Sequence, residues 1–152
     1  MKKLILIPVL FCMLLLNFSC SSSDDNNSSA DPTPVINAVR QGTWRVTSYI
    51  DSGTDKTTNF NGYTFTFGAS NVLTAANGTN NYTGTWSVTS DDDDDDDNPS
   101  SDLDFNVAFA SPASFADLSD DWDIVSHSST TISLIDISGG SGGTDILVFT
   151  KN

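Results

Sequence analysis

The sequence predicts an all-β protein, an antiparallel up-and-down meander of about eight strands that closes into a barrel. The main observation is an alternation of apolar and hydroxyl side chains with a period of two, in several short segments after residue 43. Turn-forming residues separate these segments at short intervals. In addition, all 20 acidic residues are Asp and none is Glu, a composition that favours turns and loops over helices.

The first expected element is a short helical turn at residues 35–41, where the apolar residues have near-helical spacing. The alternation begins directly after it, in a strand expected at residues 44–50. Because alternate side chains of a strand share a face, this strand has two predicted faces, namely Trp44, Val46, Ser48 and Ile50 against Arg45, Thr47 and Tyr49.

Further strands are expected at residues 62–68, 71–76, 82–89, 103–109, 122–126, 131–137 and 145–149. Between the fifth and sixth strands, residues 111–121 predict one helical turn, with Ser111 as its cap and Pro112 at its first position. Most strands have one apolar and one hydroxyl-bearing face, which predicts a wall that is dry on one side and wet on the other.

Three of these strands share one pattern, WRVTS at 44–48, WSVTS at 86–90 and WDIVS at 122–126. Each tryptophan is expected at the start of its strand, and a Val or Ile follows two residues later. Side chains two apart share a face, so both should enter the core together. The tryptophans are 42 and then 36 residues apart, which is too irregular for a repeat architecture. The pattern therefore indicates one packing solution used three times.

The tripeptide Gly42–Thr43–Trp44, placed after a short helical turn, is similar to the lipocalin signature. Together with the second GTW and the closing DILVFTK, residues 35–151 resemble the lipocalin-like domains of Bacteroidota lipoproteins. The resemblance implies a β-barrel that binds small hydrophobic molecules. It also implies a cation at the end of the last strand that stacks over the signature tryptophan, and Lys151 is the nearest candidate.

The N terminus predicts a membrane anchor. Lys2 and Lys3 precede an apolar run at residues 4–16, which as a helix would rise only about 20 Å against a bilayer core of roughly 30 Å. This is typical of a signal peptide. The stretch LNFSC resembles a bacterial lipoprotein signal, which implies cleavage before Cys20 and acylation of that cysteine. The expected division is a signal peptide at 1–19, a flexible Ser/Asp/Asn/Pro tether at 20–34 and the barrel domain at 35–152.

The following SSSDD resembles the acidic export signal of Bacteroidota surface lipoproteins. It implies a lipid-anchored location on the outer membrane, facing the cell exterior. A net charge of −14 argues against nucleic-acid binding, which depends on Lys and Arg clusters, and against adsorption to anionic lipids. The lipid anchor is therefore the expected membrane contact, and a monomer is expected. No cysteine follows Cys20, so the domain has no disulfide or thiolate metal site.

The candidate ligand-binding residues are aromatic side chains on predicted inward faces, namely Tyr63, Phe65, Phe67, Tyr82, Trp86 and Phe105. An eight-stranded barrel either fills its interior with side chains or holds one small ligand. So many large side chains in a small domain favour a largely filled interior. A shallow pocket at one mouth remains an alternative, and the same aromatics could serve the core alone.

The acidic run at residues 91–97 offers the ligand type that calcium prefers, with Asp91, Asp93, Asp95 and Asp97 as candidates. The ordered spacing of a calcium loop is missing, so the run is interpreted as a solvated hairpin loop, and no metal or cofactor is expected. His127 is the only histidine, without a Gly-x-Ser-x-Gly motif or partners for zinc. No catalytic residue and no enzyme activity are predicted.

These features predict a lipid-anchored cell-surface binding protein for a small hydrophobic ligand. The alternative is an adhesion or glycan-contact module of a surface assembly, with a closed core. A carrier requires an interior pocket lined by the six aromatics. A contact module requires a filled core and a flat or loop-borne patch of exposed aromatics.

Overall fold

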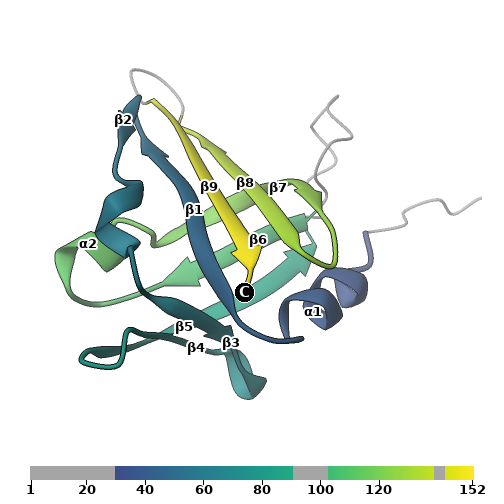
Figure 1. The fold of residues 1–152 in the computed structure, drawn as a ribbon. Coiled ribbons are helices and arrows are strands. Elements are labelled where there is room, and N and C mark those ends of the chain that lie inside the picture. Colours follow the sequence, from purple (N-terminus) through teal and green to yellow (C-terminus); the bar gives the residue numbers. More distant parts are fainter. Residues whose placement is uncertain (1–29, 91–102, 139–142) are drawn as a thin grey trace, which may run out of the picture.

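The computed structural model describes residues 30–90, 103–138 and 143–152. Their strands form one antiparallel sheet in the order β2-β1-β3-β4-β5-β6-β7-β8-β9, and β1 also pairs with β9. Because this last pairing closes the sheet, all strands except the short β2 make an eight-stranded barrel (Figure 1). The predicted all-β meander is confirmed.

The strands lie close to the predicted segments. They are β1 (Trp44–Asp51), β2 (Thr54–Asp55), β3 (Thr64–Phe67), β4 (Val72–Ala76), β5 (Asn81–Ser90), β6 (Leu103–Ala108), β7 (Asp120–His127), β8 (Thr131–Ile137) and β9 (Thr144–Lys151). The helices are α1 (Thr33–Val39), α2 (Ala113–Ala116) and the single-turn 3₁₀ segments η1 (Thr57–Phe60) and η2 (Ala69–Asn71). The hairpin β2 and the segment η1 are absent from the sequence prediction, because residues 52–59 are polar and carry no alternation.

These short helices lie at the two ends of the barrel (Figure 1). At the end where the C terminus lies, α1 buries Val35 and Val39 in the core. At the opposite end, η1 buries Phe60 and α2 buries Phe115, and the two rings meet edge to face with centroids 5.2 Å apart. The connections therefore close both ends of the barrel.

A β-bulge corrects the predicted faces of β1. The pairing of β1 with β9 shifts between Val46 and Ser48, so the alternation of side chains reverses there. Tyr49 points into the core and is 1 % exposed, whereas the prediction placed it on the outer face. Ile50 correspondingly lies on the outer face and is only partly buried. A strict period of two was wrong here because a bulge inserts one extra residue into the strand.

The paired burial of each tryptophan with its branched neighbour is confirmed, since Trp44 with Val46, Trp86 with Val88, and Trp122 with Ile124 are all buried. The prediction that each tryptophan starts a strand was right only for Trp44, because β5 and β7 begin further upstream.

The predicted cap of α2 was also wrong. Pro112 itself is the N-cap residue, and Ser111 lies before it and makes no side-chain capping bond. The helix begins at Ala113, one residue later than expected.

The two glycines of the GTW tripeptides have different roles. Gly42 has a φ of +91°, and an added Cβ would meet the Cε atom of Lys151 at 2.9 Å. A Cβ on Gly84 would lie 2.2 Å from the carbonyl oxygen of Ala108 on β6 and 2.8 Å from the ring of Phe109. Gly42 thus allows the positive φ of a turn, and Gly84 allows the close approach of two strands.

Candidate functional site

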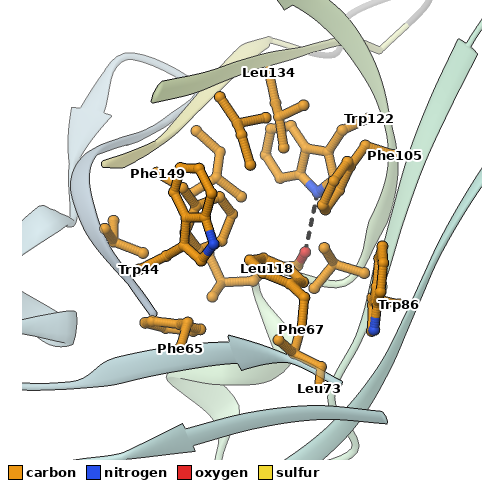
Figure 2. Packing of buried hydrophobic residues seen from close by; sticks show 14 of the residues in the cluster. Trp44, Phe65, Phe67, Leu73, Trp86, Phe105, Leu118, Trp122, Leu134 and Phe149 are labelled. Carbon is orange, nitrogen blue, oxygen red and sulfur yellow. Dashed lines mark hydrogen bonds between the residues drawn. The ribbon is translucent and has the colours of Figure 1, made fainter. Parts of the chain in front are cut away.

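The predicted ligand-binding aromatics are mostly part of a packed core. Phe65, Phe67 and Phe105 are at most 2 % exposed, and Trp86 is 5 % exposed. Phe67 meets Phe105 and Trp86 edge to face, with centroids 5.4 and 5.3 Å apart, and Figure 2 shows these rings filling the barrel interior with Trp44, Trp122 and Phe149. The rings therefore pack against one another and fill the interior.

Tyr63 and Tyr82 pack against the edge of that interior cluster, at the end of the barrel covered by α2. Both are only partly buried, and their rings stack with centroids 5.9 Å apart. Each also meets Phe115 with centroids 4.9 Å apart. The pKa of Tyr82 is raised above its ordinary value, chiefly by its hydrogen bond with Tyr63. This pair is the part of the predicted aromatic set that solvent reaches.

The three tryptophans use their indole N–H groups to fasten connecting segments to the barrel. Trp44 donates to the carbonyl of Val39 at the end of α1, at 2.8 Å. Trp86 donates to the carbonyl of Gly68, and Trp122 donates to the carbonyl of Leu118 after α2, each at 3.1 Å. Figure 2 shows the bond between Trp122 and Leu118. Because these donors are occupied, the motif that recurs three times has a structural role in this barrel.

A hollow in the described surface lies on the outside of the wall, across β5, β6 and β7. Its volume is about 600 Å³. It is lined by Asn71, Thr85, Trp86, Ser87, Asn106, Val107, Ala108, Ser119, Asp120 and Asp121. We call this hollow the outer groove. Its lining combines amides, hydroxyls and carboxylates with the apolar residues Trp86, Val107 and Ala108, whereas the barrel interior is almost entirely aromatic and aliphatic.

The strand register places three polar residues in one row across the outer groove. Ser87 on β5 lies opposite Asn106 on β6, which lies opposite Asp121 on β7. The amide nitrogen of Asn106 donates to the hydroxyl of Thr89 at 3.0 Å, which leaves the amide oxygen as an acceptor for a ligand. Ala108, two residues beyond Asn106 on β6 and on the same face, is small and exposed, which keeps that part of the groove open. The row offers one hydroxyl, one amide oxygen and one carboxylate at strand spacing.

Two carboxylates stand side by side at the β7 end of the outer groove. The backbone N–H of Asp121 donates to a carboxylate oxygen of Asp120 at 3.0 Å. Burial raises the pKa of Asp120 to about 6, helped by a side-chain hydrogen bond with Asp121 and by the charge of Asp136. Asp120 therefore gains a proton in mildly acidic solution and can then donate a hydrogen bond to a ligand.

Two smaller hollows flank α1. One, of about 120 Å³, lies between α1, η2 and β5 and touches Trp86. The other, of about 340 Å³, contains His127, Ser128, Ser129 and Lys151 beside residues of α1. His127 ends β7 and is exposed. Lys151 lies over Trp44, in the place where the lipocalin resemblance puts a strand-end cation.

Several predicted sites lie outside the described residues, namely Cys20 and the calcium candidates Asp91, Asp93, Asp95 and Asp97. Among residues 30–90, 103–138 and 143–152, no three His, Cys or Asp side chains are placed to hold a metal ion. In the same described ranges, no helix has the length and apolar character needed to span a membrane.

No protein-family model, curated protein or solved structure matches the chain significantly.

The outer groove was not among the predicted sites. Ser87 and Asn106 appear in the sequence as ordinary outward-facing polar positions of two predicted strands, and Asp121 lies before the predicted start of the next strand. Only the register brings the three into one row. The one available signal was the local pair of aspartates before WDIVS, at the start of a strand where an apolar residue is more usual.

Proposed function

We propose that this chain is a lipid-anchored cell-surface binding protein with a closed core, which binds a hydroxyl-rich ligand such as a glycan in its outer groove. The observation that carries this proposal is the polar row of Ser87, Asn106 and Asp121 across the outer groove. The fold beneath it is a closed β-barrel, an architecture used by many binding proteins.

The packing of the interior supports a contact module over a carrier of small hydrophobic molecules. A carrier needs space among the inward-facing aromatics, but Phe65, Phe67, Trp86 and Phe105 are in van der Waals range of one another or of neighbouring rings. Short helices cover both ends. An apolar ligand would have to displace side chains that are at most 5 % exposed, which costs their mutual packing.

The chemistry of the outer groove favours a neutral, hydroxyl-rich ligand. Carboxylates accept hydrogen bonds, the Asn106 oxygen accepts, and serine and threonine hydroxyls both donate and accept. A sugar presents hydroxyl groups that can satisfy all of these at once. Anionic ligands are disfavoured by Asp120 and Asp121 in the lining and by the net charge of −14.

A glycan array probed with the chain tests the groove. We expect retention of neutral oligosaccharides, and loss of that retention in Asn106→Ala, which removes the central group of the row. Thr66→Ala is the matched control, because Thr66 is exposed on β3 away from the groove. Retention that survives Asn106→Ala, or an array on which no neutral glycan is retained, would contradict the proposal.

The anchor rests on the sequence, in which Cys20 follows a signal-type apolar run and precedes a Ser- and Asp-rich tether. Several buried methylenes per acyl chain, at about 0.8 kcal/mol each, would hold the domain at the membrane despite its negative charge. Metabolic labelling with an alkyne fatty acid in a bacterial host tests it. We expect the label to be lost in Cys20→Ser and retained in Cys12→Ser, and a label that survives Cys20→Ser would rule out this anchor.

A further inference from the structure

A second surface lies on the wall formed by β8, β9 and β1. Ile146 on β9 lies opposite Ile50 on β1 and opposite Ile135 on β8, so three isoleucines form one row across three strands. Ile146 is 37 % exposed, and Ile137, two residues beyond Ile135, is 66 % exposed. We call Ile50, Ile135, Ile146 and the neighbouring Ile137 the isoleucine row.

The isoleucine row faces outward because its sequence neighbours face the core. Tyr49, Leu134 and Leu147, each next to one of the three paired isoleucines, are at most 1 % exposed. Successive residues of a strand point to opposite faces, so the isoleucines stand on the outside of the wall. The wall is therefore apolar on both faces here, whereas elsewhere its outer face carries mostly hydroxyls, amides and carboxylates, with Val72 and Val125 as exposed apolar residues.

An aspartate adjoins each of the three paired isoleucines in sequence, so by the same alternation these aspartates belong to the inner face, at the rim of one end of the barrel. Asp51 follows Ile50, Asp136 follows Ile135, and Asp145 precedes Ile146. Asp136 lies directly opposite Asp145, an arrangement of like charges that destabilises a sheet. The pKa of Tyr49 is raised to about 12, mainly by burial and then by the charges of Asp51 and Asp145.

Local donors hold these carboxylates in place. Asp145 accepts the backbone N–H of Ser52 at 2.7 Å, and Asp136 accepts the hydroxyl of Ser138 at 2.8 Å. Asp51 pairs with Lys56, which also reaches Asp117 on the segment after α2 at 3.2 Å. Each carboxylate still has acceptor positions beyond these bonds, because an ionised carboxylate offers about four.

We propose that the isoleucine row and its adjoining aspartates form a docking surface for an amphipathic polypeptide segment that carries Lys or Arg beside aliphatic residues. Apolar side chains of the segment would pack on Ile50, Ile135 and Ile146. Its long basic side chains would reach over the rim of the barrel to Asp136 and Asp145. Lysine and arginine suit this geometry, because their stems lie along apolar surface while their charged ends extend further.

Charge complementarity selects this occupant over others. A second copy of the chain would bring two aspartate sets together, with a net charge of −14 on each copy. Anionic lipid headgroups would be repelled in the same way. The row spans two strand spacings, about 10 Å, which matches a short peptide segment. A stable protein dimer interface involves many more residues, about 20–30 on each side.

The test uses the full chain in nanodiscs of neutral phosphatidylcholine and a fluorescent 12-residue peptide of alternating Lys and Val. Binding is followed by fluorescence anisotropy, with empty nanodiscs as the baseline. We expect saturable binding that weakens at least tenfold in Ile135→Ser/Ile146→Ser and severalfold in Asp136→Asn. Val72→Ser is the matched control, since Val72 is 41 % exposed on β4, on another part of the wall, and its substitution should leave binding unchanged.

The isoleucine variants separate docking from simple attraction of a cationic peptide to an acidic protein. Binding that is equal in the wild type and in Ile135→Ser/Ile146→Ser would overturn the proposal, as would the absence of saturable binding. Equal binding of a Glu/Val peptide would also overturn it. Thermal unfolding of each variant establishes that it is folded; should Ile135→Ser/Ile146→Ser unfold, Ile137→Ser tests the most exposed residue of the row.

Discussion

The Nζ atom of Lys151, the last residue of β9, lies 5.5 Å from the centroid of the Trp44 ring, the first residue of β1. Trp44 is fully buried and donates its indole N–H to the end of α1, so this one side chain joins the helix, the first strand and the last strand. The lysine covers the ring where the barrel closes, and Trp44 and Lys151 are themselves paired in the β1–β9 ladder.

Replacing Lys151 should loosen this closure. A cation over a tryptophan face contributes about 0.5–2 kcal/mol, and the lysine stem adds packing against the ring. We expect Lys151→Ala to lower the free energy of unfolding by about 1–2 kcal/mol, as measured by urea denaturation. Lys151→Arg preserves both charge and stem and should retain most of that stability. Equal losses in both variants would show that the charge over Trp44 contributes nothing.

Gly42 provides a second test of the same contact. Gly42 and Gly62 both have positive φ, +91° and +80°, so alanine is strained at either position. Only at Gly42 would the new Cβ also meet Lys151, at 2.9 Å from Cε. We expect Gly42→Ala to destabilise the chain more than Gly62→Ala, with the latter costing about 1 kcal/mol of backbone strain. In the Lys151→Ala background the two glycine substitutions should cost the same.

Tyr49 should be important for the end of the barrel covered by α2. Its hydroxyl donates to the carbonyl of Asp117 at 2.5 Å, and its ring meets Phe60 and Trp122 edge to face. Tyr49→Phe keeps the ring and removes only the hydrogen bond, so urea denaturation should show a loss of about 1–2 kcal/mol. Hydrogen exchange should quicken at residues 113–119 more than at α1. Unchanged exchange at those residues would mean that the bond does not hold α2.

Asp120 predicts an unusual dependence of stability on pH. Its folded pKa of about 6 lies above the ordinary value of about 3.9, so the folded chain binds this proton more tightly than the unfolded chain. Its contribution to stability is therefore fully present below about pH 4 and is lost as the pH rises through 6. Asp120→Asn should stabilise the chain at pH 7 by on the order of 1 kcal/mol, after discounting for solvent screening, and have little effect at pH 4.

Asp55→Asn is a control of opposite sign for that measurement. Asp55 accepts the backbone N–H of Thr57 at 2.9 Å, and its hydrogen bonds with Thr57 lower its pKa below the ordinary value. The stability that it contributes is present above its ordinary pKa and is lost as the pH falls, so Asp55→Asn should destabilise the chain at pH 7. Thermal unfolding of both variants from about pH 2 to pH 8 checks the two directions together, since the contribution of Asp55 is lost only below its ordinary pKa of about 3.9. A stability gain of Asp120→Asn that did not depend on pH would contradict the assignment.

The strands and the filled core could be predicted because local alternation decides them. Phe65 and Phe67 alternate with threonines, and Trp86 and Val88 with hydroxyls, which is enough to place each strand and its inner face. The bulges could not be predicted, because a bulge depends on the partner strand. One reverses the faces of β1 at Thr47, and another interrupts the β7–β8 pairing at Val125.

The two candidate surfaces depend on register between strands that are distant in sequence. Ile50 and Ile146 face each other only because β1 pairs with β9 and because the bulge turns Ile50 outward. Ser87, Asn106 and Asp121 come together across two ladders whose alignment no local pattern encodes. Local alternation determines which residues face the core, and the closure of the barrel determines which outward residues become neighbours.

Native mass spectrometry of the chain, extracted gently from its host membrane, tests most directly the claim that this barrel acts through its outer wall. We predict the mass of the polypeptide with its covalent lipid and no further small molecule, because the interior is filled by side chains such as Phe65, Phe67 and Phe105. A reproducible excess mass that is apolar in character and disappears on denaturation would contradict the account and identify the chain as a carrier.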